Sequence, residues 1–213
     1  MSHPALYGLA QSVYTRSARL VLEEKSIAYE FVEVDIFSDE VIPPYYLDLH
    51  PFGRIPCLVD GDFVLYETSA ITRYIDEAYP GRSLQPKDVA LRARMNQMVS
   101  MLDSYAYRPM IWDVFVERIV KPLENEETNE IIITKALPMI ETCLQELSNS
   151  LQKLSYLVNA NLTLADLHAA PILSYFLQTP EGAQMILSYP ALSEWIARMQ
   201  CRDSFKRTRS IYA

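Results

Sequence analysis

The sequence predicts two folded parts, an α/β domain followed by an all-α domain. In the first eighty residues, apolar patterns follow one another in the order strand, helix, strand, strand, strand, helix. Residues 80–86 then hold two prolines and a glycine, a composition typical of a linker. Beyond them apolar residues recur at helical spacing. We therefore expect an α/β domain over 1–80, a linker over 81–88 and a helical bundle over 89–213.

The first half of the α/β domain reads as a βαβ unit. Residues 5–8 form a short apolar run, and 29–34 alternate around Phe31. Between them, 14–25 carry apolar residues on one helical face, with Lys25 at its edge, where its long side chain would reach solvent. Two strands joined by a helix should be parallel, with a right-handed crossover. Residues 39–49, interrupted by two prolines, read as irregular or weakly helical.

The second half reads as a β-hairpin followed by a helix. The runs 57–59 and 63–66 are joined by Asp-Gly-Asp, a strong signal for a hairpin turn. Pro56 stands just before the first run, where the missing N–H does no harm to the ladder. The bond between Ile55 and Pro56 is of the one type for which a cis peptide costs little. A helix is expected over 67–79. Together the two halves predict a four-stranded mixed sheet.

The second domain reads as a helical bundle. Two patterns alternate steps of three and four, and an acidic loop over 124–130 separates them. Pro109 should kink or divide the first helix. Thr163 and Asp166 have the spacing of a capping box, and this interpretation is strongly favoured over a catalytic role for Asp166.

Composition narrows the classes of function. A formal net charge of −8 argues against a nucleic-acid-binding surface, and no apolar run is long enough to cross a membrane. The three cysteines, which are isolated in sequence, fit buried thiols in a reducing cytoplasm better than disulfides. The three histidines have no ligand-pair spacing, so no metal site is expected. The composition predicts a soluble cytoplasmic protein.

Ser12 is the first candidate for chemistry. It follows the first predicted strand and precedes the first helix, where the end of a parallel strand faces a helix N-terminus and ligands tend to bind. From spacing alone, a simple helix cap is the more frequent role for such a serine.

Four motifs in order resemble those of the cytosolic glutathione transferases, in particular the serine-type phi and theta classes. The matches are Leu6-Tyr7-Gly8-x-x-x-Ser12-x-x-x-Arg16, Pro51-Phe52-Gly53-Arg54-Ile55-Pro56, Glu67-Thr68-x-Ala70-Ile71-x-x-Tyr74-Ile75 and Thr163-x-Ala165-Asp166. Each motif is weak alone, but their order and spacing cover nearly the whole chain. The resemblance implies a thioredoxin-like first domain, a helical second domain and glutathione as co-substrate.

The resemblance also assigns roles in binding glutathione. Ile55, beside Pro56, would align the cysteinyl backbone as an added strand. Thr68 would hold the γ-glutamyl carboxylate at a helix N-terminus, and Glu67 would pair with the γ-glutamyl ammonium. Arg54 would meet the glycyl carboxylate. The alternative for Glu67 and Thr68 is simple capping of the helix.

Catalysis is assigned to Ser12, whose hydroxyl would stabilise the glutathione thiolate and so lower its pKa. Tyr7 and Tyr14 remain rivals for this role. Arg16 would either add positive potential nearby or form a plain surface salt bridge.

The chain departs from the phi-class pattern where relatives carry a His-Lys pair that helps bind the glycyl carboxylate. Val41 and Ile42 stand there, which predicts weaker glutathione binding. His50 stands where the family has Asn and reads as a turn residue.

The electrophile is expected between the two domains, on an apolar wall. The residues proposed for this wall are Leu9, Tyr107, Met110, Ile111 and Phe115. Plain core packing is the more frequent role for such side chains. Phe52 is similar to the exposed residue that inserts into a neighbouring subunit in many relatives, which predicts an isologous homodimer.

Three functions follow. The first is an enzyme whose glutathione thiolate attacks an apolar electrophile, with peroxide reduction as a possible side activity. The second is a glutathione-dependent thiol reductase, which is disfavoured because position 12 is not a cysteine. The third is a glutathione-binding scaffold without catalysis.

Overall fold

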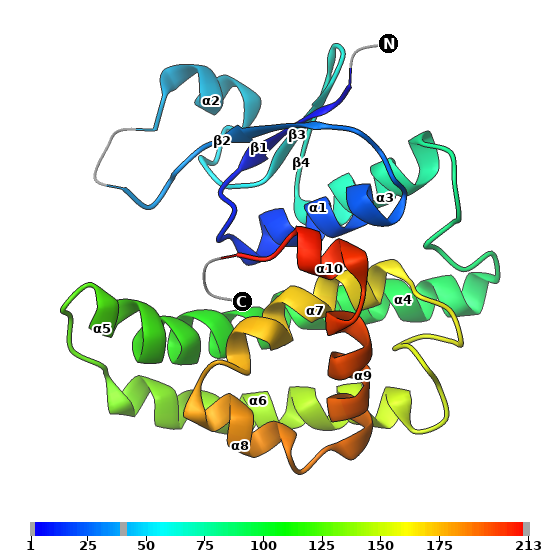
Figure 1. Ribbon diagram of the computed structural model, residues 1–213. Coiled ribbons are helices and arrows are strands. Elements are labelled where there is room, and N and C mark those ends of the chain that lie inside the picture. The colour runs from blue at the N-terminus through cyan, green and yellow to red at the C-terminus, as the bar shows by residue number, and fades with distance from the viewer. Residues whose placement is uncertain (1–2, 39–41, 211–213) are drawn as a thin grey trace. The chain divides into compact units, whose positions relative to one another are not determined.

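The computed structural model describes residues 3–38 and 42–210, and the chain divides into two compact units (Figure 1). The first unit comprises the chain up to Leu84 together with a segment that begins at Asp203. The second comprises Gln85–Arg202. The division therefore falls between residues 84 and 85, inside the predicted linker, and the described segment from Asp203 belongs to the α/β unit rather than to the helical one.

The first unit contains the predicted mixed sheet. Its strands are β1 (Ala5–Gly8), β2 (Glu30–Glu33), β3 (Cys57–Asp60) and β4 (Phe63–Tyr66). The strand order is β2-β1-β3-β4. β1 and β2 are parallel, while β3 is antiparallel to both β1 and β4. The four-stranded mixed sheet of the sequence analysis is thus confirmed.

Four helices of the described chain belong to this unit. They are α1 (Val13–Glu24), α2 (Pro44–Leu49), α3 (Thr68–Ala78) and α10 (Asp203–Arg207). α1 packs against α3. At their junction Lys25 Nζ lies 3.2 Å from Asp76 Oδ1, and both side chains are buried. The prediction that Lys25 reaches solvent is therefore wrong, because a carboxylate on α3 compensates its charge inside the unit.

The hairpin and the proline before it are also confirmed. Asp60 pairs with Phe63 across the turn, and Gly61 adopts a positive φ of 61° that suits glycine. The peptide bond between Ile55 and Pro56 is cis.

The second unit is built of helices. They are α4 (Val89–Met101), η1 (Leu102–Ala106), η2 (Arg108–Val120), α5 (Lys121–Leu123), α6 (Glu130–Leu151), α7 (Leu164–Phe176), α8 (Pro180–Ile186) and α9 (Pro190–Gln200). Every residue of α7 is buried. The first long helix changes from α to the wider π winding at Leu102, several residues before Pro109, and the prediction of a kink at the proline missed this change.

The start of α7 is a closed capping box, as predicted. Asp166 is completely buried, and its carboxylate accepts from the N–H groups of Leu157 and Thr163, both at 2.8 Å. It also accepts from Trp195 Nε1 at 2.9 Å and from the Thr163 hydroxyl at 2.8 Å. Burial raises the pKa of Asp166, and these donors oppose the shift. The carboxylate is committed to structure rather than to catalysis.

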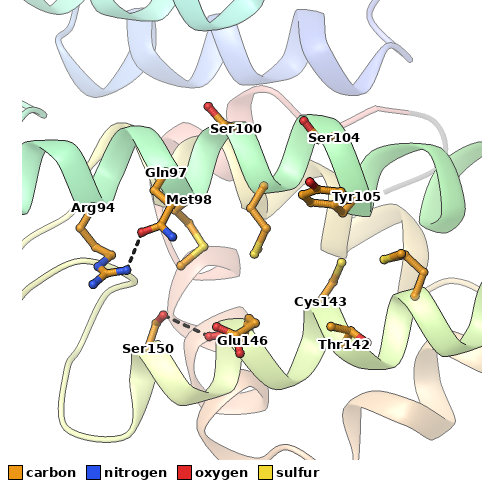
Figure 2. A pocket seen from close by; sticks show the side chains of 12 residues that line it. Arg94, Gln97, Met98, Ser100, Ser104, Tyr105, Thr142, Cys143, Glu146 and Ser150 are labelled. Carbon is orange, nitrogen blue, oxygen red and sulfur yellow. Dashed lines mark hydrogen bonds between the residues drawn. The ribbon is translucent and has the colours of Figure 1, made fainter.

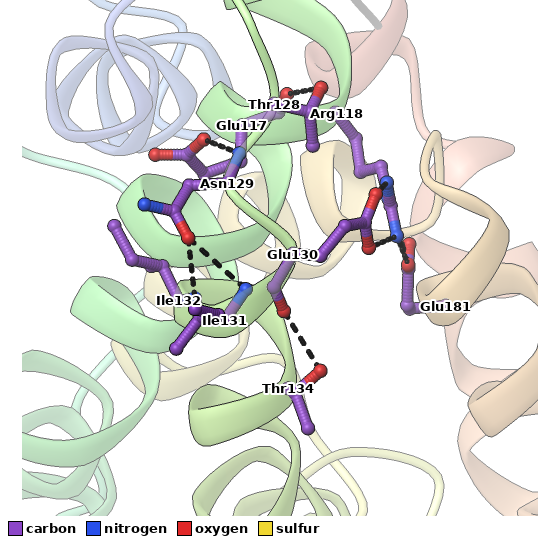
Figure 3. Close-up of polar contacts among 9 residues, drawn as sticks. All are labelled: Glu117, Arg118, Thr128, Asn129, Glu130, Ile131, Ile132, Thr134 and Glu181. Atoms are coloured by element: carbon purple, nitrogen blue, oxygen red, sulfur yellow. Dashed lines mark hydrogen bonds and ion pairs between the residues drawn. The ribbon is translucent and has the colours of Figure 1, made fainter.

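A second polar junction joins η2 to the start of α6 (Figure 3). Glu117 accepts from Lys121 Nζ and from the Asn129 N–H, each at 2.8 Å. Arg118 bridges two carboxylates, those of Glu130 and Glu181, with Nη2 2.6 Å from Glu181 Oε1. These contacts order the acidic loop that the sequence placed between the two long helices.

In the parts of the chain that the structure describes, the three thiols are free. Cys57 and Cys143 are buried as expected, whereas Cys201 is exposed, contrary to the prediction. No described helix combines the length and the apolar character that crossing a bilayer requires.

Candidate functional site

Three segments of the first unit end at the same edge of the sheet. Tyr7 near the end of β1 pairs with Cys57 at the start of β3, and Cys57 pairs with Tyr66 at the end of β4. The residues that follow β1, precede β3 and follow β4 must therefore lie close together. The sheet register thus brings the stretches containing Ser12, Ile55-Pro56 and Glu67-Thr68 to one edge.

The main chain of Ile55 lies at this end of the sheet, two residues before β3 begins. Within residues 3–38 and 42–210, neither its N–H nor its C=O forms a hydrogen bond. Its side chain is buried and packs in a cluster with Leu9, Tyr46 and Cys57. An anchored residue whose main chain is open on one side can pair with an extended peptide as a further strand.

Tyr46 holds this segment from behind. Its hydroxyl donates to the Arg54 carbonyl at 2.6 Å, and its side chain is completely buried. Burial is the main cause that raises the pKa of Tyr46, so the hydroxyl remains a donor. No local sequence signal pointed to Tyr46, because it lies in the stretch 39–49 whose two prolines predict irregular or weakly helical structure. The Arg54 side chain itself is exposed.

The start of α3 also leaves polar groups open. Glu67 precedes the helix with a φ of 69°, a conformation that is rare for a residue with a side chain. Its carbonyl accepts from the N–H groups of Ala70 and Ile71, both at 2.9 Å. In the described chain no side chain caps the helix, and the Thr68 hydroxyl and N–H form no hydrogen bond. Such groups at a helix N-terminus favour an anion, and strained residues cluster at functional sites.

His50 lies beneath this corner. It is buried, and its ring centroid is 4.7 Å from that of Tyr66. Burial lowers the pKa of His50, while the charge of Glu67 opposes the shift. The His50 ring thus packs against Tyr66, and the His50 carbonyl accepts from the Gly53 N–H at 2.9 Å, in line with its prediction as a turn residue.

Ser12 caps α1. Its hydroxyl oxygen accepts from the Thr15 N–H at 3.3 Å, and the residue is half-buried. A hydroxyl that accepts in this way still has its own proton to donate. Capping and donation to a ligand are therefore compatible in the same side chain.

Tyr7 and Tyr14, the two alternatives to Ser12 for stabilising the thiolate, lie in different surroundings. Tyr7 lies within β1 and packs on the apolar cluster, with its ring centroid 6.2 Å from that of Tyr46. Tyr14 lies in the first turn of α1, next to the cap. Arg16 is completely buried, so the alternative of a surface salt bridge is wrong.

The residues predicted for the electrophile site fall in both units. Leu9 is buried in the first unit. Met110, Ile111 and Phe115 are buried in the second, where Phe115 contacts Tyr175 edge to face at 4.9 Å. Tyr107 is half-buried and accepts from Trp112 Nε1 at 3.3 Å.

A separate cavity of about 560 Å³ lies in the second unit, between the α4–η1 segment and α6. Figure 2 shows Met98 and Cys143 pointing into it from opposite helices. Burial raises the pKa of Cys143 to about 11. Its lining comprises Arg94, Gln97, Met98, Ser100, Met101, Ser104, Tyr105, Met139, Thr142, Cys143, Glu146 and Ser150. This lining is distinct from the predicted electrophile wall.

Phe52 stands out on the surface of the first unit. It is 70% exposed, and its ring meets that of Tyr66 edge to face at 6.0 Å.

Of the two residues that replace the His-Lys pair, Ile42 is half-buried, and Val41 lies outside the described residues. Over the described ranges, no group of three or more His, Cys, Asp or Glu side chains is placed to hold a metal ion.

Comparison with known proteins matches both units. Residues 6–83 match the family model "Glutathione S-transferase, N-terminal domain", and residues 95–203 match "Glutathione S-transferase, C-terminal domain". The Arabidopsis thaliana glutathione S-transferase F7 is 30% identical, with 95% of this chain and 97% of that protein covered. The F13 protein of the same plant is 32% identical, with 94% and 92% covered.

Solved structures agree with these matches. Glutathione transferase F7 from Populus trichocarpa superposes with a TM-score of 0.85 at 29% identity, covering 96% of this chain and 97% of that one. Glutathione S-transferase III in its apo form gives a TM-score of 0.86 at 29% identity, covering 99% and 97%. The chain belongs to the cytosolic glutathione S-transferase family, and its plant relatives are of the phi class.

Proposed function

We propose that this protein is a glutathione transferase that binds glutathione at the sheet edge of the first unit and activates its thiol for attack on an apolar electrophile. The observation that carries this proposal is the open main chain of Ile55 beside a helix start that lacks a side-chain cap. The segments that carry these two features lie at the same edge of the sheet, in a chain that belongs to the glutathione S-transferase family.

Glutathione would bind as an added strand. The N–H and C=O of Ile55 would pair with the cysteinyl backbone. The Thr68 hydroxyl and N–H hold the γ-glutamyl carboxylate, and Glu67 pairs with its ammonium. Arg54 is exposed and meets the glycyl carboxylate.

Ser12 would supply the catalytic hydrogen bond. Its hydroxyl donates to the sulfur, stabilises the thiolate over the thiol, and so lowers the thiol pKa. The thiol proton leaves to solvent, the thiolate forms a carbon–sulfur bond, and the leaving group departs with its electron pair. Binding and orientation supply the remaining catalysis. As a side activity, the same thiolate would reduce a peroxide: it takes one peroxide oxygen as a sulfenic acid while the other oxygen leaves as an alcohol or water, and a second glutathione thiol then converts the sulfenic acid to the disulfide and water.

The electrophile would meet apolar side chains. Four of the five predicted residues are buried and Tyr107 is half-buried, and apolar side chains of this kind suit an apolar co-substrate. We retain them as candidates for this reason: Leu9, Tyr107, Met110, Ile111 and Phe115.

We also propose an isologous homodimer in the cytoplasm. Phe52 is too exposed to contribute to the core of its own unit, and the cavity of the second unit offers a largely apolar receptor for a phenyl ring of a second copy. Phe52→Ser should shift the protein toward the monomer in sedimentation velocity. A Phe52→Ser protein that sediments unchanged would contradict this contact.

The experiment that tests the enzymatic function is a glutathione titration followed by thiolate absorbance. In Ser12→Ala, the pKa of the bound thiol should rise by about one to two units, because a hydrogen bond to a charged group is lost. The matched control is Ser17→Ala, in the same helix, where the hydroxyl donates to the Val13 carbonyl at 3.2 Å. Its bound thiol should keep the original pKa.

Two outcomes decide between the alternatives. Retention on immobilised glutathione without any turnover of an electrophile panel would favour the non-catalytic scaffold. An unchanged thiol pKa in Ser12→Ala would remove Ser12 from the mechanism and move attention to Tyr14 or Tyr7.

A further inference from the structure

After Arg202 the chain returns to the first unit and packs α10 against α1, the helix that Ser12 caps (Figure 1). The centre of this contact is Arg16, whose side chain is completely buried. Its guanidinium carbon lies 4.0 Å from the centroid of the Phe205 ring. Its Nη2 donates to the Phe205 carbonyl at 3.3 Å. Phe205 thus contacts the Arg16 guanidinium with both its aromatic ring and its main-chain carbonyl.

The same segment also holds the other end of α1. The Ser204 hydroxyl donates to the carboxylate of Glu24, and Arg207 Nη1 lies 3.3 Å from Glu23 Oε2. Within the segment, the buried Thr208 hydroxyl donates to the Ser204 carbonyl at 2.9 Å. α1 is therefore fixed along its length by residues far away in sequence.

Arg16 is connected to Ser12 through one helical turn. Its N–H donates to the Ser12 carbonyl at 2.9 Å, and the Ser12 N–H donates to the Leu9 carbonyl at 2.9 Å. A helical turn transmits displacement because its dihedral angles are tied together by hydrogen bonds. Because the backbone of Arg16 is bonded to that of Ser12, a loss of the contacts that hold Arg16 would allow this turn of α1, and Ser12 with it, to shift.

We propose that residues 203–210 are part of the thiol-activating machinery, with Arg16 as a positioning residue for Ser12 and Phe205 as its anchor. This proposal rests on the proposed role of Ser12. Arginine suits this place because its planar, weakly hydrated guanidinium stacks on an aromatic face when buried, which an ammonium does less well. The terminal segment is then required for rate more than for glutathione affinity.

The test compares three substitutions in the full-length chain. Phe205→Leu keeps an apolar side chain but removes the ring, and Arg16→Lys keeps the charge but removes the planar fork. Lys206→Ala, on the same short helix, is the matched control, since Lys206 is 63% exposed and pairs only loosely with Asp203 at 3.7 Å. The readouts are the pKa of the bound glutathione thiol, kcat, and KM for glutathione.

Phe205→Leu and Arg16→Lys should each raise the bound thiol pKa by about half a unit to one unit and lower kcat about three- to tenfold. KM for glutathione should change less than about twofold, because the binding groups lie on other segments. Lys206→Ala should change none of the three. If Phe205→Leu does not fold, Arg16→Lys decides the question alone.

A double variant separates this proposal from the role of Ser12. If Phe205 acts through Ser12, Phe205→Leu should have no further effect on the thiol pKa in a Ser12→Ala background. Additive effects would overturn the positioning role. A raised pKa in Ser12→Ala with an unchanged pKa in Phe205→Leu would overturn it and leave the role of Ser12 intact. If neither single variant changes the pKa, both ideas fall.

Discussion

Two helices in this protein begin in opposite ways. α7 starts at a closed capping box, in which the buried Asp166 carboxylate accepts from Leu157, Thr163 and Trp195. α3 starts at Glu67, whose backbone is in a rare conformation and whose side chain does not cap the helix. Both segments match motifs of the same family, and both place polar residues before a buried helix.

The two helix starts differ in whether their polar groups serve the stability of the fold or remain available for a ligand. At α7 the Asp166 carboxylate accepts four hydrogen bonds from groups inside the protein, so these polar groups add stability rather than bind a ligand. At α3 the hydroxyl and N–H of Thr68 have no partner in the described chain, so their hydrogen bonds remain available to a bound molecule. A polar motif at a helix start can bind a ligand when its hydrogen-bonding groups are not used within the protein.

The largest effect is expected at the closed start. Asp166→Ala would leave four buried donors without their acceptor and should lower the free energy of unfolding by at least about 3 kcal/mol. Urea denaturation monitored by circular dichroism measures this change. Asn129→Ala, which removes an exposed cap at α6, is the control and should cost only about 1 kcal/mol. Equal losses in the two variants would refute a special role for the buried box.

At the open start the effect should appear in binding. Thr68→Val removes only the hydroxyl and should raise the Kd for glutathione about tenfold to a hundredfold, since the lost bond is to a charged carboxylate. The free energy of unfolding should stay within about 0.5 kcal/mol. Calorimetric titration with glutathione measures the first effect and denaturation the second. Thr72→Val, one turn further along α3, loses a bond to the Ser69 carbonyl at 3.3 Å and should bind glutathione normally.

The effect on stability at Glu67 should also be small, and its sign should differ from that at Asp166. Glu67→Gly relieves a φ of 69° and should leave the unfolding free energy unchanged or raise it by up to about 1 kcal/mol. The loss of the carboxylate should at the same time weaken glutathione binding about tenfold. Glu67→Gln, which keeps the strained backbone, should weaken binding without any gain in melting temperature. A melting temperature that falls in Glu67→Gly would argue against strain at this position.

The sequence predicted these features where the signal was local. Asp60-Gly61 and the proline at 56 specify a hairpin and its entry through turn chemistry alone, and both appear as predicted. The capping box of Thr163 and Asp166 is equally local. The placement of the segments around Ser12, Ile55 and Thr68 at one end of the sheet, in contrast, comes from the register that pairs Tyr7 with Cys57 and Cys57 with Tyr66.

The features that the sequence did not predict depend on distant partners. Lys25 reads as a solvent-seeking residue until Asp76, fifty-one positions later, is placed beside it. Arg16 reads as a surface charge until Phe205 covers it, 189 positions later. No periodic pattern reports such pairs, because each joins segments whose meeting depends on the complete fold. The π winding from Leu102 likewise has no local composition that announces it.

The division of the chain has a consequence for how the protein is made. Synthesis proceeds from the N-terminus, and domains generally fold as units while the chain emerges. The first unit, however, includes the segment that begins at Asp203, so its last piece is made only after all of Gln85–Arg202. A nascent chain that has finished the sheet still lacks the residues that cover Arg16. The first unit is thus begun first on the ribosome and completed last.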